Sequence, residues 1–293
     1  MHGQTQHFDW TSPKDQLART RPLIETVEQE LSEISAWLGL PPAPTGKLIW
    51  ITDKQDLDTL LGYRAPTWYA AVTQPNENRI IMVIHASHSQ AQLHKTLRHE
   101  LVHWAMQSLG PKAWAAQASW VHEGIAEVWT EQNLLGGMEV SLSWPAFRNE
   151  LPFLGDFESS FGSDPYRAAQ GYALSRAFFA RLQRIYGNEI FAKLMEKMLS
   201  GITLDRALID LTGNGIIDHE QEMRHELGSL SRLLADFYPQ FFLFMTLILT
   251  LGFPLAMRRK RRRHEALAQK WEAEDGLLDE DEEGSDDMWR NQS

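Results

Sequence analysis

The sequence predicts an α+β domain followed by one C-terminal transmembrane helix. Short runs of β-branched and aromatic residues gather before residue 85, whereas helical patterns dominate from Ser87 onward. Strands that come early and helices that come late are typical of α+β proteins, in which helices cover a small sheet. An uncharged run of 21 residues, 237–257, stands near the end of the chain. At 293 residues, the chain is long enough to bury one sizeable core or two small ones.

The composition excludes several classes of protein. The chain has 28 Lys+Arg and 39 Asp+Glu, a formal net charge of −11, which argues against a nucleic-acid-binding surface. It contains no cysteine, which excludes a disulfide scaffold, a thiolate metal site and a cysteine nucleophile. Any metal ion must therefore be held by histidine, aspartate or glutamate side chains.

Residues 1–46 are expected to form an N-terminal helical segment. Apolar residues recur with helical spacing over Pro13–Leu40, and Gly39 and Pro41 are typical residues for ending a helix. We place this segment before the main domain, which we expect to span residues 47–230.

A small sheet is expected in the first part of the main domain. Lys47–Thr52 is a short β-branched and aromatic run, and the pattern of a short helix follows at Lys54–Leu61. Thr67–Thr73 and Arg79–Ile84 have the composition of two strands, and the segment between them is rich in turn-forming residues. These patterns predict the strands that the later helices cover.

The next helix is expected between Ser87 and Leu109. Ser87 and Gln90, three residues later, have the capping-box pattern that begins a helix. Gly110 and Pro111 end it. Leucines at helical spacing mark its buried face.

This helix contains the sequence HELVH at residues 99–103. Because His99 and His103 are four residues apart, a helix places both imidazoles on one face, where they can bind one cation. Zinc suits two imidazoles plus a carboxylate and leaves a fourth position to water. Glu100 points to the adjacent side, where its carboxylate can take the proton of that water.

A second motif, WVHEGIAE at residues 120–127, begins 17 residues after His103. With both motifs the sequence resembles the gluzincin zinc peptidases, and more closely their peptidase MA-like domains, in which HExxH is followed by EGxAE. The resemblance implies a zincin-like fold, with a small N-terminal sheet, an active-site helix and a mainly helical C-terminal half. It also implies zinc as the cofactor and peptides or proteins as substrates.

The resemblance assigns roles to individual residues. It implies a set of three metal ligands: His99, His103 and Glu123. It implies Glu100 as the general base. His122 is an alternative ligand, although it occupies a variable position of the motif. In these families an acid one turn after the third ligand accepts the far N–H of a ligand histidine, which assigns that orienting role to Glu127.

A hydrolase of this type also needs a hydrogen-bond donor for the developing oxyanion. The segment QGYALS at residues 170–175 resembles a downstream motif of the family. Tyr172 is therefore the candidate donor, and Tyr166 is the alternative. In gluzincins, a strand near the active-site helix pairs with the substrate backbone, which points to Tyr69–Thr73 or to Ile80–Ile84.

We therefore expect a zinc metallopeptidase that hydrolyses peptide bonds with metal-activated water and Glu100 as general base. A GxMEN-like exopeptidase motif is absent from the sequence, which favours an endopeptidase. The alternative is a catalytically inactive, membrane-anchored protein that binds zinc and acts as a sensor or binding protein. Such a protein has no need for the Glu100 carboxylate.

The C-terminal region predicts a membrane anchor. As a helix, residues 237–257 would reach about 31 Å, which matches the hydrocarbon core of a bilayer. Six basic residues, 258–263, follow at once, and beside an apolar run they favour a stop-transfer flank over a nucleic-acid patch. Acidic residues come next, so 258–293 is expected to be a basic and then acidic disordered tail. By the positive-inside rule the tail is cytoplasmic and residues 1–236 lie outside.

The start of the chain leaves the route across the membrane open. Residues 1–14 lack the apolar stretch of a signal peptide. Three explanations remain: the start is incomplete, the transmembrane span acts as its own late signal, or the body stays in the cytosol.

Overall fold

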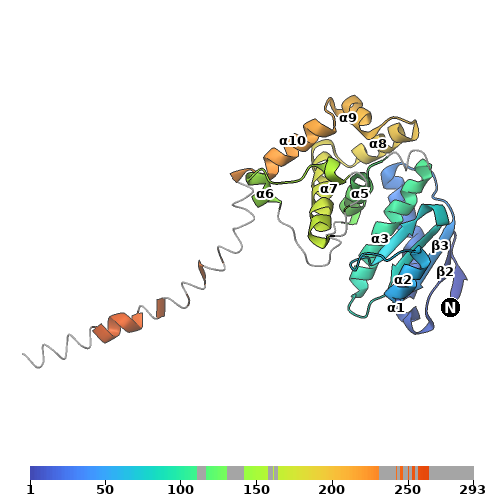
Figure 1. Ribbon diagram of the computed structural model, residues 1–293, viewed down its shortest axis with the longest axis horizontal. Helices are drawn as coiled ribbons and strands as arrows, with labels where there is room; N and C mark the ends of the chain where they lie inside the picture. The colour runs from blue at the N-terminus through green and yellow to red at the C-terminus, as the bar shows by residue number, and fades with distance from the viewer. Residues whose placement is uncertain are drawn as a thin grey trace, which may run out of the picture. The chain divides into compact units, whose positions relative to one another are not determined.

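In the computed structural model, the chain divides into two compact units, residues 1–233 and 234–293. The structure describes residues 1–110, 117–130, 142–157, 161, 164–230, 242, 245–246, 250, 253–254 and 257–263. The first unit contains the sheet and the helices labelled in Figure 1.

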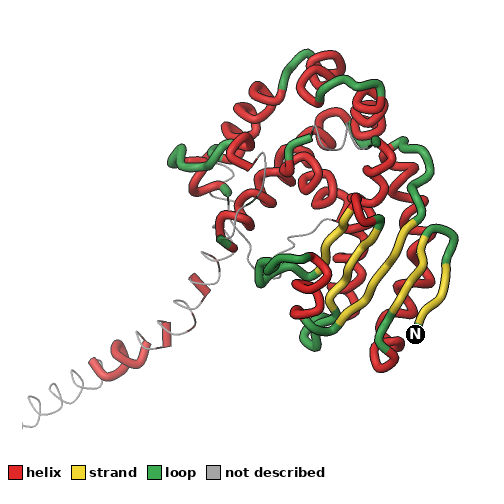
Figure 2. Tube along the Cα trace, turned by 45° about the vertical axis from the view of Figure 1, so that its right-hand side comes forward, coloured by secondary structure: helices red, strands yellow, loops and turns green. Residues whose placement is uncertain are grey.

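A five-stranded sheet forms the N-terminal part of the described chain (Figure 2). Its strands are β1 (His2–Gln4), β2 (Phe8–Thr11), β3 (Gly46–Ile51), β4 (Ala71–Gln74) and β5 (Arg79–Val83). Their order is β1-β2-β3-β5-β4; β2, β3 and β5 run parallel, and β1 and β4 run antiparallel to their neighbours. The prediction of an α+β fold with a small early sheet is confirmed, and β4 forms one edge of that sheet.

The expectation that residues 1–46 are a separate helical segment is wrong in its first part. Strands β1 and β2 lie there, and β2 pairs in parallel with β3, with Phe8 opposite Gly46. Helix α1 (Leu17–Leu38) follows and ends at Gly39, whose φ of 62° is left-handed. The two strands have only three and four residues, too few for a clear alternating pattern.

Helices cover both faces of the sheet. Helices α1 and α3 (Gln90–Met106) belong to the same core as Leu48 and Trp50 of β3. Helix α2 (Lys54–Leu61) packs on the opposite face, where Ile51 of β3 is buried. Because successive side chains of a strand point to opposite faces, β3 must be apolar on both.

The described residues of the rest of the first unit are mainly helical, as predicted. The described helices after α3 are α5 (Ser119–Thr130), α6 (Ser143–Phe147), α7 (Pro165–Tyr186), α8 (Glu189–Leu199), α9 (Leu204–Thr212) and α10 (Ile216–Leu227). Short 3-10 helices are η1 (Lys14–Gln16), η2 (Pro75–Glu77), η3 (Gln107–Leu109) and η4 (Leu154–Phe157). Helix α5 contacts both α3 and α7, so it connects the sheet half to the helical half.

Helix α5 approaches α7 closely at Gly124. A Cβ atom at this position would lie 2.6 Å from Cδ2 of Phe179 and 2.7 Å from the carbonyl oxygen of Ser175. The glycine of the EGxAE motif therefore has a packing reason, because only a residue without a side chain allows this approach. The approach also fixes the position of Glu123, one residue earlier.

Helix α3 begins two residues later than the sequence pattern indicates. The capping box is formed by Ser89 and Gln92, not by Ser87 and Gln90: Ser89 Oγ accepts from Gln92 N at 3.2 Å, and Gln92 Oε1 accepts from Ser89 N at 2.7 Å. The sequence contains two overlapping boxes, and the register of the helix decides between them.

The predicted transmembrane span, 237–257, lies largely outside the described residues. In the part of the chain that the structure describes, no helix combines the length and the apolar composition that crossing a membrane requires. The basic run 258–263 is helical, which corrects the expectation that the whole tail is disordered. Residues 264–293 lie outside the described part.

Candidate metal centre

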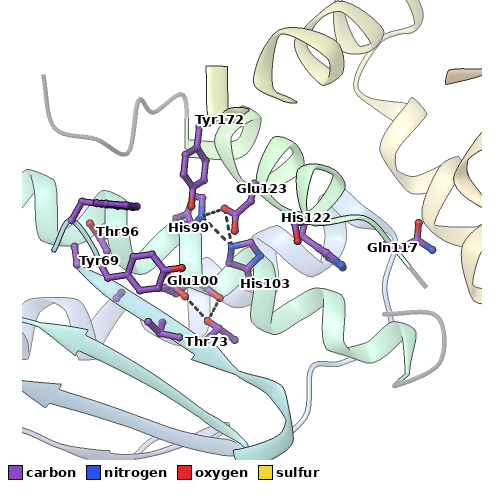
Figure 3. A pocket seen from close by; sticks show the side chains of 15 residues that line it. Tyr69, Thr73, Thr96, His99, Glu100, His103, Gln117, His122, Glu123 and Tyr172 are labelled. Atoms are coloured by element: carbon purple, nitrogen blue, oxygen red, sulfur yellow. Dashed lines mark hydrogen bonds and ion pairs between the residues drawn. The ribbon is translucent and has the colours of Figure 1, made fainter. Parts of the chain in front are cut away.

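Two histidines of α3 point toward a common position. His99 and His103 are one helical turn apart and both are buried. Their Nε2 atoms lie 3.0 Å from each other (Figure 3). The two imidazoles thus lie on the same face of α3, as their spacing of four residues predicts, because a helix stacks such side chains on one face.

Helix α5 supplies the third group. Oε2 of Glu123 lies 3.1 Å from Nε2 of His99 and 3.5 Å from Nε2 of His103 (Figure 3). Among the described residues, these three side chains are the group of histidine and acidic donors that gathers within 4.8 Å. The structure therefore brings together the three ligands that the sequence resemblance implies.

The triangle of donor atoms fits a tetrahedral zinc ion. Zinc bonds of about 2.0–2.1 Å to nitrogen and oxygen give ligand-to-ligand distances of about 3.3–3.4 Å in a tetrahedron. The three observed distances of 3.0, 3.1 and 3.5 Å lie close to these values. Two imidazoles and one carboxylate are also a donor set that zinc prefers.

The electrostatics of the cluster keep the carboxylate ionised. Burial by itself would raise the pKa of Glu123, but the charge of His103 and hydrogen bonds from His103 and His99 outweigh it and hold the pKa far below its usual range. For His103, burial by itself lowers the pKa, and the negative charge of Glu123 reverses this and raises it. An ionised carboxylate is the form in which Glu123 can bind a cation.

Glu127 lies behind the cluster, one turn after Glu123. Its side chain is 1% exposed, and its Oε1 lies 3.9 Å from Nδ1 of His99. This distance exceeds that of a hydrogen bond. The carboxylate is on the side of His99 that the predicted orienting role requires, and the role itself stays a prediction.

Glu100 projects to the other side of α3, toward the sheet. Its side chain is 6% exposed, and its Oε2 accepts a hydrogen bond of 2.6 Å from Oγ1 of Thr73 in β4 (Figure 3). Glu100 and the three converging donors line the same cavity of about 340 Å³. The predicted base therefore faces the space in which a substrate bound at the cluster would lie.

Among the described residues, two tyrosines line this cavity, and one of them, Tyr172, is the predicted donor. Tyr172 of α7 stacks on Phe161, with ring centroids 4.5 Å apart. Burial and the negative charge of Glu123 raise its pKa well above 10, so its hydroxyl remains an O–H donor. The alternative, Tyr166, is 55% exposed and is not among the residues that line the cavity. Tyr69 lines it instead.

His122 also lines the cavity but does not join the cluster. Figure 3 shows its ring on the Gln117 side, directed away from the converging atoms of the donor cluster. The geometry thus distinguishes His122 from the three converging donors. From the sequence alone, this distinction rests on the family motif.

The sheet order separates the two strands proposed to bind substrate. β5, which contains most of Ile80–Ile84, is paired on both sides, with β3 and with β4. β4 is an edge strand, and residues 68–73, which lead into it and form most of it, line the cavity. Of the two candidate segments, Tyr69–Thr73 is therefore the one that lies at an edge of the sheet beside the site.

The comparison with known families agrees with this geometry. A family model described as the peptidase MA superfamily matches residues 29–227. The chain belongs to the peptidase MA superfamily. No curated protein matches it. As a member of the peptidase MA superfamily, it has a metallopeptidase-like domain, and the matched range contains His99, His103 and Glu123, the three residues of the candidate metal centre.

Two of the cavity residues of this peptidase MA domain appear in the sequence analysis only as the ends of a candidate strand, without a role of their own. They are Tyr69 and Thr73, whose side chains line the cavity beside Glu100. The sequence pattern indicates a strand here but not its partner, and the side chains reach the site only because β4 lies at the sheet edge next to α3.

Proposed function

We propose that this protein is a zinc-dependent peptidase that hydrolyses peptide bonds within extended polypeptide segments. One observation carries the proposal: three donor atoms from His99, His103 and Glu123 converge beside the buried carboxylate of Glu100, in a cavity bordered by an edge strand. The family match supports the peptidase class.

The chemistry divides between the ion and the protein. His99, His103 and Glu123 would hold the zinc ion, which would act as a Lewis acid toward the substrate carbonyl and would lower the pKa of the attacking water. Glu100 accepts the proton of the attacking water and then donates it to the leaving amine. Tyr172 keeps its hydroxyl proton and donates a hydrogen bond to the oxyanion as it develops.

The edge strand would align the substrate. A peptide added alongside β4 satisfies backbone donors and acceptors that face the cavity, and this holds its scissile bond near the donor cluster. Because a strand can continue in both directions past the site, this mode suits an endopeptidase. The lack of a GxMEN-like motif supports the same choice.

We further propose that a helix over residues 237–257 anchors the peptidase in the cell membrane, with the basic run 258–263 on the cytoplasmic side. The support is the uncharged length of the first segment and the charge of the second. Tags at both ends of the chain and protease added to intact cells test this. Cleavage of the C-terminal tag alone, or of neither tag, contradicts a peptidase domain outside the cell.

Peptidase activity is tested with the full chain purified in detergent. We expect about one zinc per chain and hydrolysis of an unstructured protein such as casein. Glu100→Gln should retain the zinc and lose at least about 100-fold in rate, since it removes the general base. Glu196→Gln, an exposed change on α8, is the matched control and should not alter the rate.

The rival function is a protein that binds zinc without catalysis. Stoichiometric zinc with no hydrolysis in the wild type, or equal rates in the wild type and in Glu100→Gln, would favour this rival. A folded chain that binds no zinc would contradict both functions.

A further inference from the structure

We infer that Thr73 is a positioning residue that holds Glu100 against the edge strand β4, so that the strand proposed to bind substrate also orients the proposed general base. The inference rests on the proposed peptidase function. The Thr73 hydroxyl lies 2.6 Å from Oε2 of Glu100 and 3.3 Å from its carbonyl oxygen (Figure 3).

The direction of the Thr73 side chain follows from the sheet. Successive residues of β4 point to opposite faces. Val72 packs with the cluster on the α2 face, whereas Ala71 packs with the core that contains α3. Thr73, two residues after Ala71, therefore points toward α3 and meets Glu100 there. The residue sits in register opposite Ile80 of β5, which fixes its position along the strand.

The hydrogen bond is of the strong kind. A hydroxyl that donates to an ionised carboxylate makes a shorter and stronger bond than a neutral pair, and 2.6 Å is in that range. Within the described part of the chain, no other group donates to the Glu100 carboxylate. Since Glu100 is only 6% exposed, loss of this donor leaves its carboxylate with one protein hydrogen bond fewer, which water from the cavity side replaces only in part.

The same strand has a second role in the proposed mechanism. One side of β4 is paired with β5, and residues along β4 line the cavity. A substrate segment that pairs with β4 would therefore lie on the element that holds Glu100. Because β4 would pair with the substrate and also holds Glu100 through Thr73, this one short strand would set the distance between the scissile bond and the base.

Activity separates positioning from substrate binding. Thr73→Val keeps the shape of the side chain and removes the hydroxyl. We expect it to lower kcat by about 10–30-fold and to change KM by less than about threefold. A tenfold loss of kcat equals about 1.4 kcal/mol of activation free energy. Thr73→Ser restores the hydroxyl and should recover most of kcat. Thr130→Val is the matched control, because this buried threonine donates to Ala126 within its own helix. Its kcat should stay at the wild-type value.

A second measurement does not depend on activity. On the metal-free full chain, thermal unfolding of Thr73→Val, Glu100→Leu and the double variant forms a double-mutant cycle. We expect Thr73→Val to lower Tm by about 3–6 °C when Glu100 is present, and by much less when leucine replaces it, since the carboxylate no longer needs a donor.

The outcomes distinguish the two hypotheses. If the wild type hydrolyses no peptide, the proposed function fails, and the unfolding cycle still decides whether Thr73 holds Glu100. If the cycle shows no coupling, or if kcat of Thr73→Val equals that of Thr130→Val in an active enzyme, the positioning role is overturned. A loss that appears in KM alone would also overturn it.

Discussion

The glycine of the EGxAE motif offers the sharpest test of how packing forms the metal centre. The change is Gly124→Ala, which adds a single methyl group. That methyl would lie 2.6 Å from Cδ2 of Phe179 and 2.7 Å from the carbonyl oxygen of Ser175. The phenylalanine ring can turn, but the carbonyl belongs to the backbone of α7 and cannot. Helix α5 must therefore move away from α7, and Glu123 moves with it.

The magnitude follows from two opposing effects. Alanine in place of glycine inside a helix is worth about 1 kcal/mol of stability. Overpacking of a close contact typically costs about 1–3 kcal/mol, and the backbone clash puts Gly124→Ala at the upper end of that range. The net destabilisation is about 1–2 kcal/mol, which lowers Tm by about 2–8 °C. Displacement of Glu123 should also weaken zinc binding by about tenfold or more.

Two assays on the full chain measure these effects. Thermal unfolding by circular dichroism gives Tm, and competition with a chromophoric chelator gives the zinc affinity. Gly155→Ala is the control, because a Cβ at that glycine meets no atom of the described residues within 4 Å. If Gly124→Ala matches the wild type in both Tm and zinc affinity, the close approach of α5 to α7 does not position Glu123 and the reasoning is refuted.

Three further predictions follow from the site and from the helical half. Glu123→Gln should weaken zinc binding, measured by chelator competition, by at least about 100-fold. This loss is larger than the one expected when a residue that only orients a metal ligand is removed. Wild-type affinity would exclude Glu123 as a ligand. Tyr172→Phe should lower kcat for peptide hydrolysis by about 100-fold, as for loss of an oxyanion donor, whereas Tyr166→Phe should stay within about twofold. Equal rates would remove Tyr172 from the mechanism. Burial and the charge of Arg181 lower the pKa of His219, so the folded state resists its protonation. The contribution of His219 to the free energy of unfolding is therefore complete above pH 6.5 and is lost as the pH falls below that value. Between pH 7.5 and 5.5, Tm should therefore fall less in His219→Gln than in the wild type.

Local patterns predicted the parts of the structure that are formed by neighbours in sequence. The spacing of His99 and His103 places both rings on one helical face whatever the rest of the fold does, because a helix repeats about every 3.6 residues. The strand at 79–83 and the helix at 54–61 carry enough apolar residues to be recognised alone. By contrast, Glu123 was predicted as a ligand from the family motif, because its spacing from His103 alone does not indicate that role.

The parts that were missed depend on pairings between distant segments. β2 pairs with β3, nearly forty residues later in the chain, and a strand of four residues has too little pattern to show it. The contact between Thr73 and Glu100 requires the sheet order, since β4 reaches α3 only by lying outside β5. No property of the threonine itself indicates that contact. The start of α3 was misplaced because two capping boxes overlap, and only the helix register selects Ser89.

The length of the edge strand has a consequence for the kind of protein that can be cut. β4 has four residues, Ala71–Gln74, so a partner strand pairs along only about 13 Å. Pairing of this kind reads the backbone and not the side chains, and it requires a segment that can straighten. Helical and tightly folded regions fail that requirement. A peptidase built on this edge would therefore select by conformation, cutting linkers, loops and damaged or unfolded chains while sparing intact domains of the same composition.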